Sequence, residues 1–575
     1  MAELRALLEM RQAVPLSFSP DGGRLLVGSN VPGTQQLYTV PVGGGALEQL
    51  TDLGEPVTGA FLPDGRVLVE IDEGGNERTQ LYVLADGQLE PLVVDARFIH
   101  HTPLARGGRL AYATNRGNGV DFEIVVRELA SGEERVFDLR GYVGVEAFSA
   151  DARYVVAERL GDRSGDNDLY LCDADTGEVT LLTAHDEPSE FASPAWFDGA
   201  LLMSTNLDRD TFAVVGPAGV VYESAWDAAC AADDSGSHLL VAENADGYSR
   251  LLLDGEEVPL PGRGVVEHPV FSPDGSLLAF SFSSPIEPHD VYLYDVGSRA
   301  LDRLTTSPRD VDSRALVEPT LHRFESFDGL SVPVFLFEPE GAGPFPVVVT
   351  VHGGPESQWR PWFSPSFAPL TQFLVSRGYA VAAPNVRGST GYGKRYEHLD
   401  DIELRLDSVD DLASLHDWLA RRPSIDALRA VVYGRSYGGY MVLAALAFQP
   451  DRWAAGLEAV GIANLVTFLE NTSPYRRAAR EREYGSLARD REVLERVSPL
   501  THVDAIRAPL FIQHGRNDPR VPVSESEHIH AVLTAKGIEC ELLVFDDEGH
   551  TVEKLHNRIE TFERMTAFLD RVLAG

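Results

Sequence analysis

The first half of the chain is a succession of short apolar stretches separated by polar turns. Each unit places a small or aromatic residue before a turn of the Pro-Asp-Gly type and a short apolar strand after it, then a second strand and a short closing strand. The pattern recurs seven times, beginning at Leu16, Gly59, Thr102, Glu146, Pro194, Cys230 and Pro269. A period of about 40–45 residues with four strands in each unit is typical of propeller blades. The sequence therefore predicts a seven-bladed β-propeller over residues 13–315.

In the second half, continuous apolar runs alternate with helical patterns. The runs cover residues 346–351, 379–384, 429–434, 509–515 and 541–547, and the helical patterns include 408–422 and 524–537. Continuous apolar runs are expected of parallel strands that are buried on both faces. An α/β domain, with a mostly parallel sheet covered by helices on both faces, is therefore expected over residues 316–575. Residues 1–12 indicate a helix ahead of the first blade, for which packing on the second domain is one expectation.

The composition is that of an ordinary globular protein, with 44% apolar and 24% charged residues, but the charge is one-sided. The 49 basic and 88 acidic residues give a formal net charge of −39. A phosphate backbone would be repelled by that field, so nucleic acid is not an expected partner. No run approaches 18 apolar residues, and the first residues lack a basic region followed by an apolar core. Neither a membrane span nor a cleaved signal peptide is therefore expected.

The cysteines are few and scattered. Cys172, Cys230 and Cys540 lie far apart and without CxxC spacing, which predicts neither a disulfide framework nor a cysteine-built metal site. This usage favours a reducing cytoplasm. No motif along the chain implies a metal or an organic cofactor, and none is expected.

A G-x-S-x-G pattern at residues 434–438 is the first sign of chemistry. Glycines in this motif permit a strained turn from a strand into a helix, which lifts the serine hydroxyl out of the sheet. The apolar segment AVVY leads into the pattern, and the helical stretch GGYMVLAALAF begins at its last residue. The motif requires this order of strand, turn and helix. Ser436 is therefore the predicted nucleophile.

A serine nucleophile needs a base that is oriented by an acid, and α/β-hydrolases carry the three in the order Ser, acid, His. Asp518 follows the apolar run 509–515, and His550 follows the run 541–547. Loops at the carboxyl ends of parallel strands gather at one edge of a sheet, so these residues can converge on Ser436. The sequence predicts Asp518 as the acid and His550 as the base. The competing acids are Asp546, Asp547 and Glu548, and the competing bases are His514, His528, His530 and His556.

The tetrahedral intermediate of acyl transfer needs preorganised N–H donors. One predicted donor is the backbone N–H of Tyr437, the residue after the nucleophile. The other is expected from the glycine-containing loop at 352–355, in which Gly353 and Gly354 allow the backbone to approach the oxyanion.

Together these segments resemble the prolyl oligopeptidase family of serine peptidases. The resemblance is carried by HGGP at 352–355, NVRGSTGYG at 385–393, GRSYGGYM at 434–441, NDPRVP at 517–522 and EGH at 548–550. A seven-bladed propeller ahead of an α/β-hydrolase domain is the architecture of that family, so the resemblance spans the whole chain. HGGP with GRSYGGYM is most similar to the acylaminoacyl-peptidase branch. This implies removal of a blocked N-terminal residue from short peptides, with the propeller excluding folded proteins.

The sequence departs from two other branches of that family. Prolyl oligopeptidase and the dipeptidyl peptidases place a tyrosine hydroxyl in the oxyanion hole, where this chain has His352. The second oxyanion donor is therefore expected to be the backbone N–H of Gly354 or Gly353. The propeller sequence also shows no obvious Glu-Glu pair of the kind that anchors a free amino terminus in dipeptidyl peptidases.

Specificity is predicted from the segment that starts at Gly461, which in the family borders the pocket for the residue before the scissile bond. Its candidate pocket walls are Phe468, Leu469 and Tyr475. Four arginines follow within seven residues, namely Arg476, Arg477, Arg480 and Arg482. They form either a solvated helix face with i,i+4 ion pairs or a fork that holds the free C-terminus of a substrate. Arg520 resembles a family arginine that contacts substrate near the scissile bond.

These observations lead to a serine exopeptidase that acts on short peptides through an acyl-enzyme, with acylaminoacyl-peptidase activity as the leading hypothesis. A carboxypeptidase that uses the arginines to hold a terminal carboxylate is a second hypothesis. A carboxylesterase is a third, because esters and amides are hydrolysed by the same machinery. A non-enzymatic propeller protein with a vestigial hydrolase domain is disfavoured by the complete set of candidate residues. Exposed sheet edges and propeller rims are compatible with a homo-oligomer.

Overall fold

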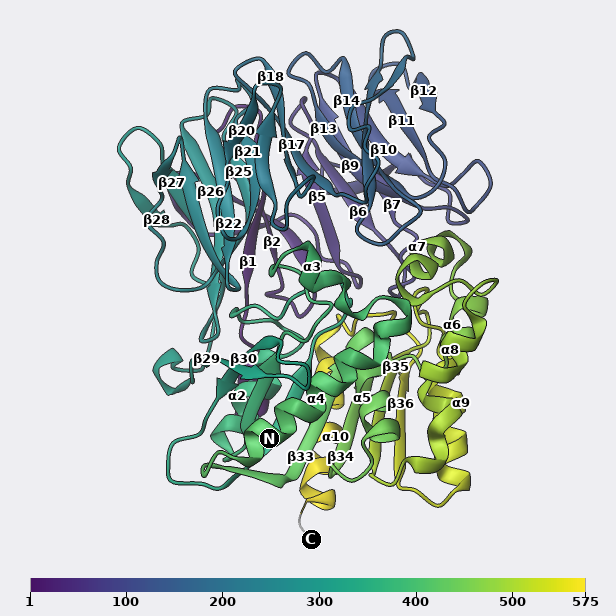
Figure 1. Ribbon diagram of the computed structural model, residues 1–575. Helices are drawn as coiled ribbons and strands as arrows, with labels where there is room; N and C mark the ends of the chain where they lie inside the picture. Colours follow the sequence, from purple (N-terminus) through teal and green to yellow (C-terminus); the bar gives the residue numbers. More distant parts are fainter. Residues whose placement is uncertain (1, 574–575) are drawn as a thin grey trace.

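The computed structural model describes residues 2–573. Figure 1 shows two stacked halves, with β-sheet blades above and a mixed layer of helices and strands below. The upper half contains seven four-stranded antiparallel sheets, and the lower half contains one eight-stranded sheet. The predicted order of a seven-bladed β-propeller followed by an α/β-hydrolase domain is confirmed.

Each blade of the propeller is built from four consecutive strands. In chain order the blades are β1 Ala13–Phe18, β2 Arg24–Ser29, β3 Gln36–Pro41, β4 Glu48–Gln49; β5 Val57–Phe61, β6 Val67–Ile71, β7 Gln80–Ala85, β8 Gln88–Val93; β9 His100–Arg106, β10 Arg109–Thr114, β11 Glu123–Glu128, β12 Glu134–Phe137; β13 Val143–Phe148, β14 Tyr154–Leu160, β15 Asn167–Asp173, β16 Val179–Leu181; β17 Phe191–Phe197, β18 Ala200–Thr205, β19 Ala213–Gly216, β20 Gly219–Tyr222; β21 Asp227–Ala232, β22 Leu239–Ala245, β23 Tyr248–Leu253, β24 Glu256–Glu257; β25 Val265–Phe271, β26 Leu277–Ser284, β27 Glu287–Asp295, β28 Leu301–Arg303. The first and last blades share no strand and meet through β1, which contacts β25 and β27.

The repeated Pro-Asp-Gly signal forms the hairpin between the first two strands of a blade. In the first blade the Ser19 hydroxyl donates to Asp21 at 2.6 Å, and Gly22 adopts a φ of 70°. The same contact recurs as Ser149 to Asp151 at 2.6 Å. A left-handed residue at this place suits a tight hairpin turn, which is why the signal repeats with the blades.

The α/β-hydrolase sheet has the strand order β29-β30-β32-β31-β33-β34-β35-β36. Its strands are β29 Thr320–Glu325, β30 Ser331–Phe337, β31 Phe345–Val351, β32 Ala380–Pro384, β33 Ile425–Arg435, β34 Ala455–Ala459, β35 Leu510–Gly515 and β36 Cys540–Phe545. From β32 to β36 neighbouring strands are parallel, whereas β29 and β30 are antiparallel to their neighbours. The carboxyl ends of β31, β33, β35 and β36 therefore lie at one edge of the sheet.

Helices cover this sheet, and Figure 1 shows α4 and α5 in front of the central strands. The α-helices are α1 Ala2–Leu8, α2 Ala368–Ser376, α3 Lys394–Glu397, α4 Arg405–Ala420, α5 Tyr437–Phe448, α6 Leu465–Asn471, α7 Pro474–Tyr484, α8 Arg491–Val497, α9 Ser524–Ala535 and α10 Leu555–Val572, with short 3₁₀ helices at Ser313–Ala315, His398–Asp400, Ile402–Leu404 and Pro499–Ala505. None of the helices within residues 2–573 is long and apolar enough to cross a membrane.

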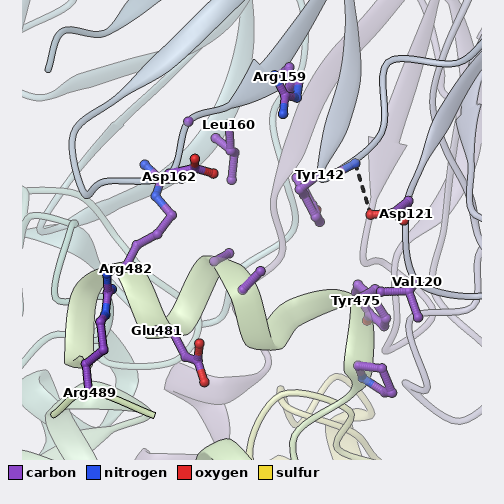
Figure 2. A pocket seen from close by; sticks show the side chains of 15 residues that line it. Val120, Asp121, Tyr142, Arg159, Leu160, Asp162, Tyr475, Glu481, Arg482 and Arg489 are labelled. Carbon is purple, nitrogen blue, oxygen red and sulfur yellow. Dashed lines mark hydrogen bonds between the residues drawn. The ribbon is translucent and has the colours of Figure 1, made fainter. Parts of the chain in front are cut away.

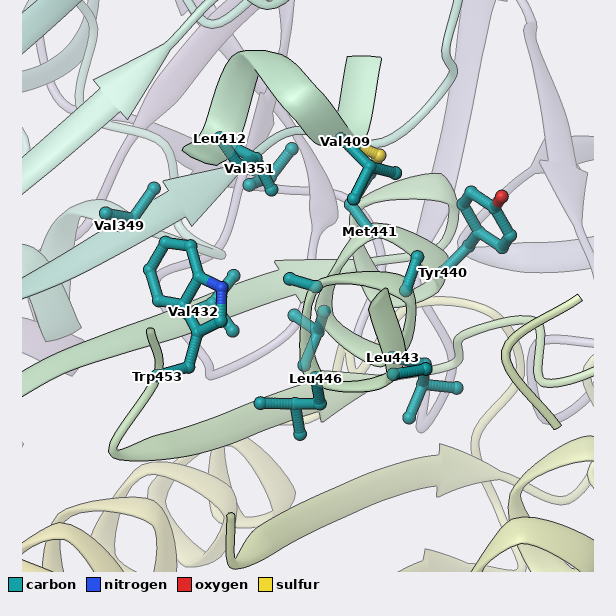
Figure 3. Close-up of a cluster of buried hydrophobic side chains, with 14 of the residues drawn as sticks. Val349, Val351, Val409, Leu412, Val432, Tyr440, Met441, Leu443, Leu446 and Trp453 are labelled. Carbon is teal, nitrogen blue, oxygen red and sulfur yellow. The ribbon is translucent and has the colours of Figure 1, made fainter. Parts of the chain in front are cut away.

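The largest core cluster surrounds α5, which is apolar on every side (Figure 3). Met441 and Leu443 are fully buried there, and Trp453 is 4% exposed. Glycines let α5 approach its neighbours closely: a methyl group on Gly438 would lie 2.2 Å from the carbonyl oxygen of Val351. The start of α5, which carries the candidate nucleophile, is thus held firmly against the sheet.

The N-terminal helix α1 lies in the lower half of the molecule, away from the propeller that follows it (Figure 1). It contacts α2 and α10, and Leu4, Leu7 and Leu8 are buried in the second core cluster of the hydrolase domain. Arg5 forms an ion pair with Glu563 of α10. The chain therefore starts on the hydrolase domain, builds the propeller and returns.

Candidate active site

Ser436 occupies a strained turn between β33 and α5. Its φ of 61° and ψ of −121° place a non-glycine residue in a region that L-residues rarely adopt. The strain is held by the surroundings, since Ser436 N–H donates to the carbonyl of Ala459 at 2.9 Å. A methyl group on Gly434 would lie 2.2 Å from the carbonyl oxygen of Gly438, so the turn requires glycine there. This is the local geometry expected of a nucleophile elbow.

Asp518 and His550 form a directly bonded pair. His550 Nδ1 lies 2.7 Å from Asp518 Oδ2, and both residues are buried. Asp518 Oδ1 accepts from the backbone N–H groups of Arg520, at 2.8 Å, and Val521, at 3.1 Å. Burial alone would raise the pKa of Asp518, but the His550 and His514 imidazoles outweigh it and hold that pKa well below its usual range. The carboxylate is therefore ionised and oriented toward His550.

The protonation of His550 follows from its partners. Because an ionised carboxylate only accepts, Nδ1 carries the hydrogen in the bond to Asp518 and the lone pair is on Nε2. Burial lowers the pKa of His550 to about 4, against the opposing effect of Asp518. The imidazole is thus neutral at pH 7, with Nε2 able to act as a general base.

The nucleophile and the base are connected through the residue next to the serine. Arg435 donates from Nη2 to the carbonyl oxygen of His550 at 3.0 Å and also bonds to Thr551. Within residues 2–573 no hydrogen bond joins the Ser436 hydroxyl to the His550 ring. Catalytic hydrogen bonds of this kind commonly tighten only when substrate is bound.

The loop after β31 faces the nucleophile. A methyl group on Gly353 would lie 3.3 Å from the Cβ of Ser436, and Gly354 adopts a φ of 128°. Tyr437, whose N–H is the other predicted donor, is the first residue of α5 and directly follows Ser436. The His352 ring instead contacts the Ser389 hydroxyl, at 2.8 Å, and the carbonyl of Gly353, at 2.7 Å. Backbone groups, rather than that ring, are thus available to an oxyanion here.

The three predicted pocket walls lie in different places. Phe468 and Leu469 are buried in the core cluster around α5, and the Phe468 ring meets Tyr484 edge-on at 5.7 Å. Tyr475 packs on the propeller, where its ring lies 5.8 Å from that of Phe122. Figure 2 shows Tyr475 at one end of a cavity that lies between α7 and the part of the propeller that carries Tyr142 and Arg159. The volume of this cavity is about 210 Å³. The structure thus places Tyr475 at the domain interface.

The predicted arginines have protein partners. Arg520 Nε lies 2.5 Å from Glu77 of the second blade, and Arg476 Nη1 lies 3.5 Å from the same carboxylate. Arg477 donates to the carbonyl of Glu470 in its own domain at 2.7 Å. Arg480 lies 4.0 Å from Glu356. Arg482 donates to the propeller carbonyls of Arg163, at 2.6 Å, and Asp166, at 3.0 Å.

A second cavity, of about 400 Å³, has His550, the predicted base, in its wall. It lies between the first two blades and the loops after β35 and β36, and its lining includes Glu70, Glu77, Arg520 and His550. The blades reach the catalytic loop directly, because Asn517 Nδ2 donates to the carbonyl of Gly74 at 3.0 Å. The propeller is therefore one wall of the space in front of the base.

A group of carboxyls near the glycine loop was not predicted from the sequence. Glu190 comes from the propeller, whereas Glu356 and Glu397 come from the hydrolase domain. Burial raises the pKa of Glu190 and of Glu397, and the neighbouring carboxyl groups raise both further. Glu356 accepts from the Ser164 hydroxyl of the fourth blade at 3.1 Å. This side of the site thus disfavours additional negative charge.

The carboxyls of Asp400, Asp401 and Glu483 lie close enough together to surround a cation. The guanidinium of Arg405, buried between Asp400 and Glu483, already forms ion pairs with both. The Tyr437 hydroxyl donates to Asp400 at 2.7 Å. These residues do not fit a metal site, because an arginine occupies the position of the cation.

Comparison with known proteins identifies the C-terminal domain. The sequence model of the prolyl oligopeptidase family matches residues 365–575. Residues 365–575 thus match the prolyl oligopeptidase family, and the rest of the chain lies outside this match. The family resemblance predicted from the sequence is thereby confirmed, and the G-x-S-x-G elbow, Asp518 and His550 all lie within the matched residues.

Two relatives of this chain carry different names. Dipeptidyl aminopeptidase BIII of Pseudoxanthomonas mexicana is 32% identical over 56% of this chain and 48% of its own length. Acylamino-acid-releasing enzyme 1 of Oryza sativa subsp. japonica is 28% identical over 38% of this chain and 29% of its own. The chain thus matches about half the length of the first relative and less of the second.

Solved structures extend the likeness of fold to nearly the whole chain. A puromycin hydrolase superposes with a TM-score of 0.86 at 20% identity, covering 99% of this chain and 96% of its own. An acylaminoacyl peptidase of Pyrococcus horikoshii superposes with a TM-score of 0.71 at 19% identity, covering 95% and 93%. The two-domain fold is therefore shared over nearly the whole chain.

Proposed function

We propose that the protein is a serine exopeptidase that hydrolyses short peptides through an acyl-enzyme. The observation that carries this proposal is the strained Ser436 turn at the sheet edge where the bonded His550–Asp518 pair also lies. The family of the C-terminal domain supports peptides as the substrates. The cytoplasmic location, the lack of a nucleic-acid partner and the homo-oligomer expected from the sequence are retained as parts of the proposal.

The steps follow from the geometry of the site. His550 Nε2 removes the hydroxyl proton of Ser436 as its oxygen attacks the peptide carbonyl, and Asp518 stabilises the imidazolium that forms. The N–H of Tyr437 and an N–H of Gly353 or Gly354 receive the oxyanion. His550 then protonates the departing amine, and a water activated by the same imidazole releases the acyl group.

Within this class we retain acylaminoacyl-peptidase activity as the first candidate, on the HGGP loop and on relatives of that name. A dipeptidyl aminopeptidase is the second candidate, favoured by the carboxyls of Glu190, Glu356 and Glu397 near the glycine loop. A free amino terminus is a cation and would stabilise the ionised form of these carboxyl groups, whereas an acetylated terminus carries no charge that could do so. Relatives named as dipeptidyl peptidases agree with this second candidate.

The carboxypeptidase hypothesis has less support. The arginines it needs are engaged, since Arg520 and Arg476 lie against Glu77 and Arg482 is bonded to propeller carbonyls. A substrate carboxylate would have to displace those partners. The carboxylesterase hypothesis is tested below with an ester that matches the peptide substrate.

The test uses one short sequence prepared with a free amino terminus, with an acetylated amino terminus and with an amidated carboxyl terminus. Products of the wild type and of Ser436→Ala are compared by mass spectrometry. Release of an acetylated residue supports the first candidate, and release of a dipeptide from the free form alone supports the second. Release of C-terminal residues that amidation abolishes would favour the carboxypeptidase. Hydrolysis of a matched ester without any peptide product would contradict the peptidase proposal.

A further inference from the structure

His514, which the sequence offers as an alternative base, lies beside the predicted catalytic acid. It is the fifth residue of β35 and is fully buried, with an exposed fraction of 0%. Its Nε2 lies 3.4 Å from Asp518 Oδ2, the same oxygen that accepts from His550. One carboxylate oxygen is thus shared by two imidazoles, of which the mechanism above uses only one.

The hydrogen on the His514 ring can be assigned from its second contact. Nε2 lies 2.9 Å from the carbonyl oxygen of Val521. Because a carbonyl oxygen only accepts, Nε2 carries a hydrogen and donates it to Val521. The other nitrogen, Nδ1, lies 2.7 Å from the Ser526 hydroxyl at the start of α9. The ring therefore connects the loop after β35 to the helix that follows the loop.

That loop is the one that holds Asp518. The carboxylate receives the N–H groups of Arg520 and Val521 on Oδ1, and Val521 is the residue whose carbonyl accepts from His514. A bond to the Val521 carbonyl restrains the backbone of Val521, whose own N–H is one of these two donors. The same N–H of His514 presents its positive end 3.4 Å from Oδ2, where a negative charge is stabilised.

We propose that His514 is a positioning residue for the triad acid. By donating to Val521 it holds the 515–521 loop in the conformation that binds Asp518 Oδ1. By its charge distribution it keeps Oδ2 ionised and directed at His550. The inference rests on the proposed function, since it concerns the acid of the same Ser436, Asp518 and His550 set.

Other ionisable groups surround the ring. Asp518 lies on one side, and Glu458 of β34 and Glu525 of α9 also act on it electrostatically. Burial raises the pKa of Glu458 to about 7, and one of its carboxyl oxygens is buried without a hydrogen-bond partner. Burial lowers the pKa of His514, but Asp518 and Glu458 outweigh it and raise that pKa overall. In either charge state Nε2 keeps its hydrogen, so the role proposed for it is the same.

The test compares His514→Gln with His514→Asn. A glutamine amide nitrogen reaches the position of Nε2 and can donate to Val521, whereas asparagine is too short to do so. We expect His514→Asn to lower kcat roughly 10- to 100-fold with KM within about 3-fold, the range expected for losing a hydrogen bond near a charged group. His514→Gln should keep kcat within about 5-fold. Thermal midpoints of both variants are measured in parallel.

The proposal would be overturned by a loss of kcat that is equal in the two variants, because the loss would then not depend on a donor to Val521. A rise in KM with kcat unchanged would overturn it as well. Ser526→Ala provides a second approach if the substitutions at 514 do not fold. It keeps Nε2–H but frees the ring, and should lower kcat about 3- to 10-fold at unchanged KM. Wild-type kcat in Ser526→Ala would contradict the role.

Different results would overturn the proposed peptidase function and the proposed role of His514. Absence of hydrolysis by the wild type, or hydrolysis that persists in Ser436→Ala, would overturn the proposed function and this inference with it. Hydrolysis that depends on Ser436 but is unchanged in His514→Asn would overturn the role of His514 alone.

Discussion

The elbow that carries Ser436 and the interface between α7 and the propeller differ in how they are built. The elbow is assembled from neighbours in the sequence: β33, the glycines of residues 434–438 and α5 follow one another without a gap. The interface joins residues far apart, such as Arg482 and Arg163, which are 319 positions apart. The strained turn at Ser436 is thus specified by residues adjacent in the sequence, whereas the cavity beside His550 depends on how the two domains meet.

The strongest way to test this comparison is to remove the nucleophile. Ser436→Ala should lower kcat by roughly 10⁴–10⁶-fold, because the remaining groups cannot form an acyl-enzyme. The fold should be unaffected, since the change removes only a hydroxyl group. Steady-state kinetics with a short peptide, together with a thermal melt, check both parts, and wild-type turnover in the variant would contradict the role of Ser436.

A smaller effect is expected when the turn itself is distorted. In Gly434→Ala the new methyl group would lie 2.2 Å from the carbonyl of Gly438, so the turn must shift. A displacement of about 1 Å can cost about 10²-fold in rate, and activity should fall by that order together with the thermal midpoint. Gly262→Ala is the matched control, because a methyl group there meets no atom within 4 Å. Equal behaviour of the two variants would show that the elbow is not constrained as described.

The pH dependence tests the environment of the base. His550 must be neutral to act, and burial lowers its pKa to about 4. Since the neutral form persists above that value, kcat/KM should be nearly constant from pH 7 to about 5. It should then fall as the pH drops through about 4, approaching tenfold per pH unit. An acid limb centred near the ordinary histidine pKa of about 6.5 would contradict the buried environment of His550. Circular dichroism at each pH separates this effect from acid unfolding.

The smallest effect concerns the interface. Glu77→Gln removes the charge that faces Arg520 and Arg476, and it should change kcat/KM about 3- to 10-fold, mainly through KM. Partly exposed ion pairs contribute little and are screened, so the effect should shrink as salt is added. Glu73→Gln, an exposed position of the same loop, is the control and should behave as the wild type. A loss confined to kcat would place Glu77 in the chemistry instead of the binding surface.

The sequence predicted what short-range patterns encode. The seven blades follow from a turn repeated at a nearly constant interval, and the hydrolase sheet follows from continuous apolar runs, each of which became a strand. The strand β34 was not predicted, because Glu458, the fourth of its five residues, interrupts the apolar pattern. Its burial is a property of the assembled sheet, in which β33 and β35 flank it.

The candidate site also has parts that short-range patterns predict and parts that depend on the assembled structure. The loops of Asp518 and His550 follow predicted strands, and the structure bonds the two residues at 2.7 Å. The cluster formed by Glu190, Glu356 and Glu397 corresponds to no sequence motif. Glu190 and Glu356 are 166 positions apart and meet only across the domain interface. The partners of Arg476, Arg480 and Arg482 are equally distant in the sequence, which is why the sequence left a solvated helix face and a substrate fork as alternatives.

The most direct test of the central claim is active-site labelling with a fluorophosphonate, which reacts with an activated serine hydroxyl. The labelled protein is digested and the modified residue is located by mass spectrometry, with Ser436→Ala and heat-denatured wild type as controls. The account predicts a single adduct on Ser436 that is absent from both controls. An adduct on a different serine, or no adduct on a folded protein, would contradict the assignment of Ser436 as the activated nucleophile.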